Sequence, residues 1–324
     1  MKTNVYPLLL TILLAACHSD DEGLLSPSLL DKDWLRVEDS TDPLDRARYE
    51  IYREHGISIF YSDTLGKLFR GINVYGDSII HVEKLDPFYS VTGQDASTTY
   101  ALSKNRDDLL DGVRFFKENI LPTLLPAFYP GTVLLVGELT LNAFNTEDRG
   151  KRPGNVYNGY RTMILSNVGN VGNMSGDERR ALTEDIAAAT WYKYASARHA
   201  VSLELFFAVS EALYTPQPSQ PSVYFMMISS GVTVNYKPHW YQYGFLESGP
   251  SMPGQLAPNP SVPGEYTRYY TPTRDEDAIM FFRAVFHYTP EEFDAEYGDV
   301  NGHELLRQKY DMIHAIVSTI KNTR

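Results

Sequence analysis

The chain has 324 residues, of which 43% are hydrophobic and 13% aromatic, so it can bury a large core as one or two domains. Acidic residues outnumber basic residues by 41 to 29, which gives a formal net charge of -12. No run of lysine and arginine could follow a phosphate backbone, and nucleic acid is therefore excluded as an expected partner.

The first seventeen residues, MKTNVYPLLLTILLAAC, predict an export signal. A lysine stands near the start, and the apolar run that follows is too short for a membrane span and ends in small residues. The end of the run resembles the bacterial lipobox, in which the cysteine is acylated. We therefore expect a signal peptide over 1–17 and membrane contact through acyl chains on Cys17, the only cysteine. An unmodified cysteine in a signal region is the alternative.

The acidic run HSDDE follows the cysteine directly. It resembles the signal that sends Bacteroidetes lipoproteins to the outer cell surface, so the expected location is the outer membrane, facing the exterior. The polar, acidic residues 18–40 predict a tether. Residues 41–324 then form one domain, in which a sub-boundary could fall near 170.

The first half of that domain shows helix and strand signals in alternation. Thr41-Asp42-Pro43 predicts the start of a helix that ends at Gly56. ISIFYS predicts extended chain, and GINVYGDSIIHVEKL predicts a half-buried hairpin around Tyr75-Gly76-Asp77. Helical spacing resumes over 105–128 with a break at Pro122, and TVLLVGELTL and YRTMILS each predict a strand.

The second half is predicted to be mainly helical. Ser175, with Glu178 three residues later, predicts a capping box at the start of a long helix. Thr273 is expected to cap a helix over DEDAIMFFRAVFHY, and Thr289-Pro290-Glu291-Glu292 predicts the start of a short helix. Proline-rich stretches at 215–222 and 248–266 interrupt the pattern, and the longer one is a surface excursion or a lid. The chain closes with a helix whose apolar stripe is Leu306, Tyr310, Ile313, Val317 and Ile320. The order predicts an α+β fold with an antiparallel β-rich N-terminal half and a helical C-terminal half.

Several segments occur in an order that resembles a known family. They are PLDRARYEIYREHGISIFYSD, FFKENILPTLLPAFYPGTVLLVGELTLNAFNT, GYRTMILSNV, ALTEDIAAATWYKY, YGF and DEDAIM. This order is similar to that of the substrate-import-associated zinc metallohydrolase lipoproteins of Bacteroidetes, which accompany TonB-dependent nutrient importers. The likeness covers nearly all of the mature chain and rests on order and spacing. It implies a zincin-like arrangement for the helical half.

Carried onto this chain, the resemblance implies a metal-site helix without its ligands. A zincin helix carries two histidines four residues apart and a glutamate beside the first. Glu184, Asp185 and Ala188 stand at those positions. In the later helix Asp275 and Glu276 remain acidic, whereas Ile279 replaces the second glutamate of the family pattern. We therefore expect neither a zinc cofactor nor hydrolysis by the family mechanism.

Two further groups of residues could form a binding site, one for calcium and one for a glycan or peptide, and each also has a simpler structural explanation. Glu184, Asp185 and the 275–277 trio could hold calcium through oxygen ligands, but acidic residues in a first helical turn also favour the helix dipole. Trp240, Tyr241 and Tyr243 lie in the tyrosine-rich stretch VNYKPHWYQYGF and could bind a glycan or peptide. Packing is the commoner use of such rings.

These observations predict a cell-surface lipoprotein that is a catalytically inactive accessory or binding component of a TonB-dependent importer for glycan or peptide. The importer setting comes from the resemblance alone. Two alternatives stay open: an active hydrolase with a non-standard metal site, and a purely structural partner of the importer.

Overall fold

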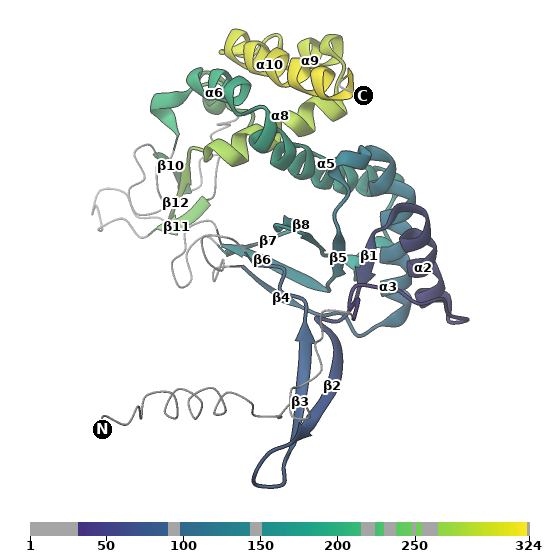
Figure 1. Cartoon of the computed structure of the whole chain (residues 1–324). Coiled ribbons are helices and arrows are strands. Elements are labelled where there is room, and N and C mark those ends of the chain that lie inside the picture. Colours follow the sequence, from purple (N-terminus) through teal and green to yellow (C-terminus); the bar gives the residue numbers. More distant parts are fainter. Residues whose placement is uncertain are drawn as a thin grey trace, which may run out of the picture. The chain divides into compact units, whose positions relative to one another are not determined.

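The computed structural model describes residues 32–89, 98–142, 151–214, 224–229, 238–247, 251–254 and 265–322 (Figure 1). Contacts divide these residues into two compact units. The smaller unit contains residues 32–36 and Thr64–Lys84. The larger unit contains Val37–Asp63 and the described residues from Leu85 onward. Position 170 lies in the larger unit, and Val37, near the end of the predicted tether, is buried in that unit.

The smaller unit is built around a two-stranded antiparallel hairpin (Figure 1). Its strands are β2 (Thr64–Ile72) and β3 (Ser78–Lys84). The Asn73 side-chain oxygen accepts hydrogen bonds from the backbone N–H groups of Tyr75 and Asp77, and Gly76 has a φ of 90°, so the turn is fixed locally. The predicted hairpin is confirmed. No residue of either strand is fully buried, and half-buried residues alternate with exposed ones along much of both strands.

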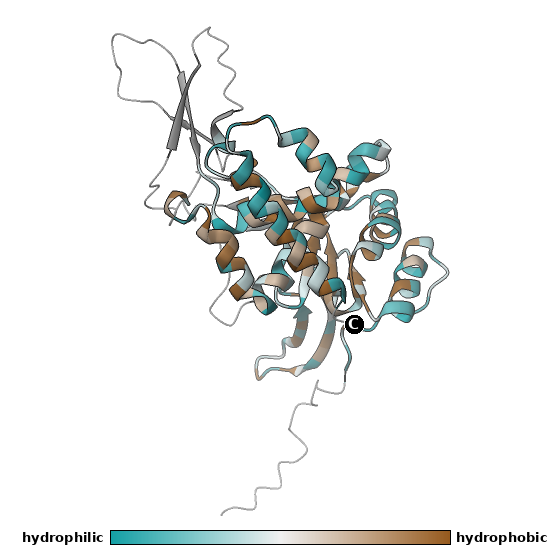
Figure 2. Ribbon diagram, turned by 90° about the horizontal axis from the view of Figure 1, so that it is seen from above, coloured by the Kyte–Doolittle hydropathy of each residue, from teal (hydrophilic) through white to brown (hydrophobic). Residues whose placement is uncertain are grey.

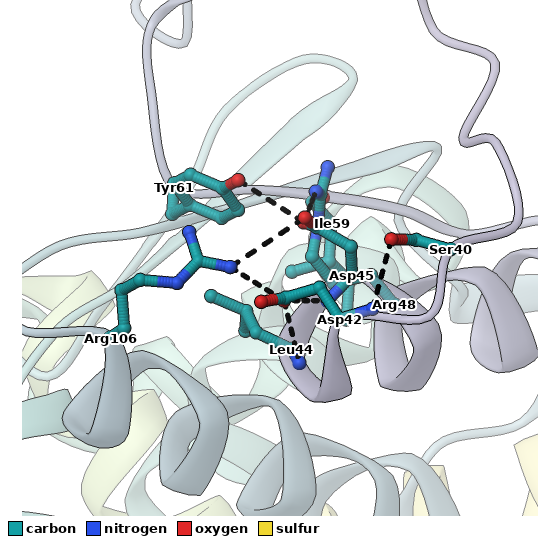
Figure 3. Close-up of polar contacts among 8 residues, drawn as sticks. All are labelled: Ser40, Asp42, Leu44, Asp45, Arg48, Ile59, Tyr61 and Arg106. Atoms are coloured by element: carbon teal, nitrogen blue, oxygen red, sulfur yellow. Dashed lines mark hydrogen bonds and ion pairs between the residues drawn. The ribbon is translucent and has the colours of Figure 1, made fainter.

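The larger unit begins with α2 (Pro43–His55), whose ends match the prediction. Asp42 caps the start through hydrogen bonds from the backbone N–H groups of Leu44 and Asp45, and Gly56 ends the helix with a φ of 70°. Figure 3 shows that Asp42 also receives a hydrogen bond of 2.5 Å from the Arg106 guanidinium. This contact joins the start of α2 to the start of α3 (Arg106–Phe115).

A four-stranded sheet with the order β1-β5-β9-β8 forms the centre of the larger unit. Its strands are β1 (Ser58–Phe60), β5 (Thr132–Leu135), β8 (Val156–Asn158) and β9 (Thr162–Leu165). β1, β5 and β9 run parallel, and only β8 is antiparallel to its neighbour. The expectation of an antiparallel N-terminal half is wrong for this sheet. The connection from β1 to β5 contains α3, and the connection from β5 to β9 contains β6, β7 and β8, so long crossovers return the chain in the same direction.

A second sheet packs on one face of this central sheet. It has the order β4-β6-β7 and consists of β4 (Thr99–Ala101), β6 (Glu138–Asn142) and β7 (Lys151–Pro153). The predicted single strand TVLLVGELTL is therefore two strands in different sheets. The chain changes sheets at two residues: the Val136 N–H bonds to the Leu165 carbonyl, and the Gly137 N–H bonds to the Ala101 carbonyl.

The opposite face of the central sheet packs on helices. Alternate residues of β5 separate the two cores: Val133 and Leu135 belong to the helix-side core, and Leu134 belongs to the core between the sheets. The ribbon is accordingly brown where helices and strands meet and teal along their outward sides (Figure 2). The larger unit thus has three layers, with helices, central sheet and second sheet in that order.

The 105–128 segment is helical, as predicted, but it is not one regular helix. α3 continues into a π-helical turn, Phe116–Ile120, and then into the 3₁₀ turns Leu121–Thr123 and Pro126–Phe128. Pro122 lies in the first 3₁₀ turn, where the helix breaks.

The second half supplies most of the helix layer. Its helices are α4 (Val168–Val171), α5 (Gly176–Arg198), α6 (Ala200–Ala208), α7 (Pro238–Tyr241), α8 (Arg274–His287), α9 (Pro290–Tyr297) and α10 (His303–Asn322). The capping box predicted at Ser175 is confirmed, and so are the helix starts predicted at Thr273 and Thr289, which also form capping boxes. The predicted apolar stripe of α10 is confirmed, since all five of its residues are buried.

The longer proline-rich stretch, 248–266, contains β structure in the part that the structure describes. β11 (Ser251–Gly254) and β12 (Glu265–Tyr270) pair with each other, and β10 (Tyr224–Ser229) pairs with the other edge of β12. The shorter stretch, 215–222, lies outside the described residues.

Candidate functional site

Helix α5 carries the residues that the sequence placed at the degenerate motif. Its N-terminus is fixed by the Ser175 capping box, and its apolar side packs into the helix-side core. Ala188 is completely buried in that core. Glu184 and Asp185 precede it by one turn and lie on the side of α5 that meets α8.

Two residues of α8 bind these acidic side chains. The His287 Nδ1 lies 2.8 Å from the Glu184 Oε2, and the Arg283 Nη1 donates to the Asp185 Oδ1 at 3.2 Å. The Asn155 side-chain amide donates to the other Asp185 oxygen at 3.3 Å. Each carboxylate of the degenerate motif therefore already has a hydrogen-bonded neighbour within the protein.

The acidic residues at the start of α8 lie elsewhere. Asp275 accepts a hydrogen bond from the Tyr192 hydroxyl, and Glu276 forms the capping box with Thr273. Asp275 and Glu276 precede Arg283 by eight and seven positions on α8, so they lie about 10 to 12 Å from it along the helix axis. Ile279 packs against the core. The structure thus does not bring the 275–279 residues to Glu184 and Asp185.

The carboxylates considered for calcium are likewise separated. Asp277 is completely buried in an ion pair with Lys309, and Asp275 and Glu276 are engaged at the start of α8. Within the described ranges, no three histidine, cysteine, aspartate or glutamate side chains are grouped so that they could hold a metal ion.

A pocket of about 300 Å³ opens between α5 and α8, and we call it the α5–α8 pocket. Ala181, Met280 and Ala284 contribute apolar surface. The polar and aromatic side chains that line it are Glu184, Asp185, Glu247, Arg283, His287, Tyr288 and Tyr297. The pocket therefore presents carboxylates, a guanidinium, an imidazole and phenol rings to a ligand.

Arg283 organises the charges of this pocket. Its guanidinium forms ion pairs with both Asp185 and Glu247. Burial alone would lower the pKa of Arg283, but the charges of Glu247 and Asp185 outweigh burial and raise the pKa. The pocket thus contains a permanent cation that belongs to the chain itself.

Tyrosines form the aromatic wall of the pocket. Burial raises the pKa of Tyr288 and of Tyr297, so both hydroxyls stay protonated at neutral pH and can donate hydrogen bonds. The two rings pack edge to face with centroids 6.1 Å apart. Tyr241 packs on the same Tyr297 ring, with centroids 5.5 Å apart.

The aromatic residues considered as possible ligand contacts are partly engaged in packing. Trp240, Tyr241 and Tyr243 are half-buried and pack against the core. Tyr241 contacts the wall of the α5–α8 pocket through its packing on Tyr297.

A second pocket, of about 240 Å³, lies beside the C-terminal part of α5. Its lining includes Tyr129, Tyr160, Arg161, Lys193 and Tyr194 but no carboxylate and no histidine. The α5–α8 pocket is the better candidate site, because it combines acceptors, donors and an imidazole in one place.

Sequence analysis did not single out Arg283, His287 or Glu247. One signal was present: Arg283 and His287 are four residues apart on a helix and so face the same side. Nothing in the sequence indicated that this side meets Glu184 and Asp185, which are about one hundred residues earlier.

The predicted lipidation site, Cys17, lies outside the described residues. None of the described helices combines the length and apolar character that a bilayer crossing requires. No family model, curated protein or solved structure matches this chain.

Proposed function

We propose that this chain is a lipid-anchored outer-membrane protein that faces the exterior and binds a glycan or peptide fragment in the α5–α8 pocket. In this proposal it serves a TonB-dependent importer as a non-catalytic accessory. Its helical half would be zincin-like, with α5 in the place of the metal-binding helix. The pocket between α5 and α8 and the position of Glu184 and Asp185 at its wall support this arrangement.

The observation that carries the proposal is the position of Arg283. Its guanidinium bridges Asp185 and Glu247 at the pocket, where a metal ion would need free carboxylates. An arginine cannot lose its proton at any physiological pH, so its charge opposes a second cation at short range. Ala188 adds to this argument, because a buried methyl group at the second ligand position offers no donor atom.

The side chains of the pocket favour a polar ligand rich in hydroxyl or amide groups. Arg283 and the tyrosine hydroxyls are donors, whereas Glu184, Asp185 and Glu247 are acceptors. Aromatic walls beside such groups suit sugar rings and peptide planes. A volume of about 300 Å³ corresponds to the small end of known ligand sites.

A binding screen against glycans and short peptides tests this function. Calorimetry of the intact protein should find a ligand, and Arg283→Met should weaken its binding roughly tenfold to one hundredfold, since charge-assisted hydrogen bonds are lost. Arg274→Met is the matched control, because Arg274 lies on the same helix but pairs with Glu204 and Glu211 outside the pocket. Equal losses in both variants would remove the pocket from the proposal.

The contact between Glu184 and His287 favours a second candidate function, that of an active hydrolase. A carboxylate that lies 2.8 Å from an imidazole in a pocket could act together with it as a general base that deprotonates a bound water. Turnover of a bound glycan or peptide that is lost in Glu184→Gln and in His287→Ala would establish this function. Zinc in stoichiometric amount, released by the same substitutions, would overturn the non-catalytic reading.

A further inference from the structure

The β2–β3 hairpin has two faces of different character. In its register, Lys67 lies opposite Val82, Phe69 opposite Ile80 and Ile72 opposite Ser78. Directly opposed residues of an antiparallel pair point to the same side, so these residues share one face with Lys84. Leu68 and His81 oppose each other on the other face.

Trp34 covers part of that second face. Its ring lies 6.2 Å from the His81 ring, between centroids, and a Cβ placed on Gly66 would approach the Trp34 ring to 2.5 Å. Gly66 thus leaves room for the indole ring. The Lys32 Nζ lies over the Trp34 ring, 3.7 Å from its centroid.

The first face is exposed, and we call it the apolar-basic face. Phe69 is 59% exposed, Ile72 65% and Ile80 53%. Val74 and Tyr75 in the adjoining turn are also exposed, at 94% and 87%. The remaining residues of the face are Thr64, Lys67, Ser78, Val82 and Lys84.

Such a surface needs an occupant. Apolar area in water costs about 25 cal/mol per Å², and a hairpin of two strands has no second layer to remove that area from solvent. Contiguous apolar surface of this kind marks a site of protein or membrane contact.

The charges of the apolar-basic face favour an anionic lipid surface over a protein surface as its partner. The chain has a net charge of -12, but this face carries two lysines and no carboxylate. The acidic side chain of the turn, Asp77, is bound by the Asn73 side-chain amide at 3.1 Å. Apolar residues flanked by lysines are typical of segments that lie in the boundary between lipid headgroups and acyl chains.

The position of the hairpin in the chain agrees with this charge pattern. Trp34 packs on the hairpin, and only residues 18–31 separate the described chain from Cys17. Fourteen residues span at most about 50 Å when fully extended. An acyl anchor at Cys17 would therefore keep the hairpin within reach of the membrane.

We propose that the apolar-basic face of the β2–β3 hairpin binds an anionic lipid surface, as a second membrane contact beside the acyl anchor. Val74 and Tyr75 enter the boundary of the acyl chains, while Lys67 and Lys84 pair with lipid phosphates. The acyl anchor at Cys17 is part of the function proposed above. The biological role of the apolar-basic face therefore rests on that proposed function.

Vesicle binding by unacylated protein tests the face separately from the anchor. The full chain with Cys17→Ser is mixed with phosphatidylcholine vesicles that contain or lack 30% phosphatidylglycerol, and bound protein is sedimented. Vesicles with phosphatidylglycerol should bind it at least tenfold more strongly. Lys67→Glu with Lys84→Glu should abolish that difference, because each lysine near an anionic surface contributes roughly a fivefold change in affinity.

Two variants that replace exposed apolar residues by aspartate, one in the hairpin turn and one on α6, test the apolar contribution to vesicle binding. Val74→Asp with Tyr75→Asp should reduce vesicle binding at least tenfold, whereas Val201→Asp, on the 80% exposed position of α6, should leave it unchanged. Circular dichroism confirms that each variant is folded.

The proposal is overturned if the Cys17→Ser chain fails to bind either kind of vesicle or if the turn variant binds as well as its parent. A turn variant that changes the sedimentation coefficient of the protein but not its vesicle binding would assign the face to a second copy of the chain instead. Labelling with a radioactive fatty acid reports acylation of Cys17 independently. Its failure would contradict the anchor without affecting the vesicle result.

Discussion

At the scale of single residues, the most constrained group is the buried ion pair of α8 and α10. The Lys309 Nζ lies 2.6 Å from the Asp277 Oδ2, and neither side chain is exposed. Lys309 also donates to the Gly244 carbonyl at 2.9 Å and to the Ser210 hydroxyl at 3.2 Å. The Tyr214 hydroxyl donates to the same Asp277 oxygen at 2.5 Å. Burial raises the pKa of Asp277 and lowers that of Lys309, so each depends on the other for its charge.

Lys309→Met should destabilise the protein by about 3 to 5 kcal/mol, because it leaves a buried carboxylate without its cation. The free energy of unfolding in urea measures this loss. Adding Asp277→Leu to the same chain should recover part of it, since two apolar residues replace the ion pair. Lys104→Met, at an exposed position, is the control. A loss in Lys309→Met no larger than in Lys104→Met would mean that the ion pair does not support the fold.

At the scale of elements, one residue at a helix start can both cap its own helix and contact another helix. Asp42 caps α2 and also receives the guanidinium of Arg106 from α3 (Figure 3). The hydrogen bond from the Asp45 backbone lowers the pKa of Asp42, and Arg106 lowers it further. A carboxyl whose pKa is lower in the folded chain stabilises the fold above its ordinary pKa, which is 3.8 here. That contribution disappears as pH falls through the lowered value.

Asp42→Asn should therefore be less stable than the parent at pH 7, and the difference should shrink as the pH falls below about 4. Asparagine retains the cap but not the charge, so the variant isolates the ion pair with Arg106. Urea unfolding of both proteins between pH 7 and pH 3 measures the difference. A difference that stays constant over this range would mean that the charge of Asp42 contributes nothing.

At the scale of the whole molecule, the chain consists of two units that differ in how they bury apolar residues. The larger unit has a core between helices and sheet, whereas neither strand of the hairpin has a buried residue. The hairpin leaves the larger unit at two adjacent positions, since the Leu85 N–H donates to the Asp63 carbonyl at 2.7 Å. This geometry allows the hairpin to be removed by joining the two positions.

Replacement of Thr64–Lys84 by an Asn-Gly turn should leave the larger unit folded, because such a turn connects adjacent antiparallel chain ends. Its thermal midpoint should change by less than about 4 °C, which corresponds to roughly 1 kcal/mol in a protein of this size. Scanning calorimetry measures the midpoint. Loss of a cooperative transition would show that the larger unit requires the hairpin.

Local signals in the sequence were sufficient for most helices. The capping boxes at Ser175, Thr273 and Thr289, the ends of α2 and the apolar stripe of α10 depend on residues within one or a few turns of each other. The same holds for the hairpin turn at Asn73–Asp77. Strand pairing could not be predicted in the same way from the sequence, because the relative direction of β1, β5 and β9 depends on connections far longer than any local pattern.

The sequence by itself determined where α2, α5, α8 and α9 begin, and that Ala188 offers no metal ligand. Only the tertiary structure decided which charges meet. Arg283 lies 98 residues from Asp185, and the two come together because α5 and α8 pack their apolar sides into one core. Packing of the Trp34 ring likewise decided which face of the hairpin is left open. Both outcomes depend on contacts between distant segments, which short-range spacing does not encode.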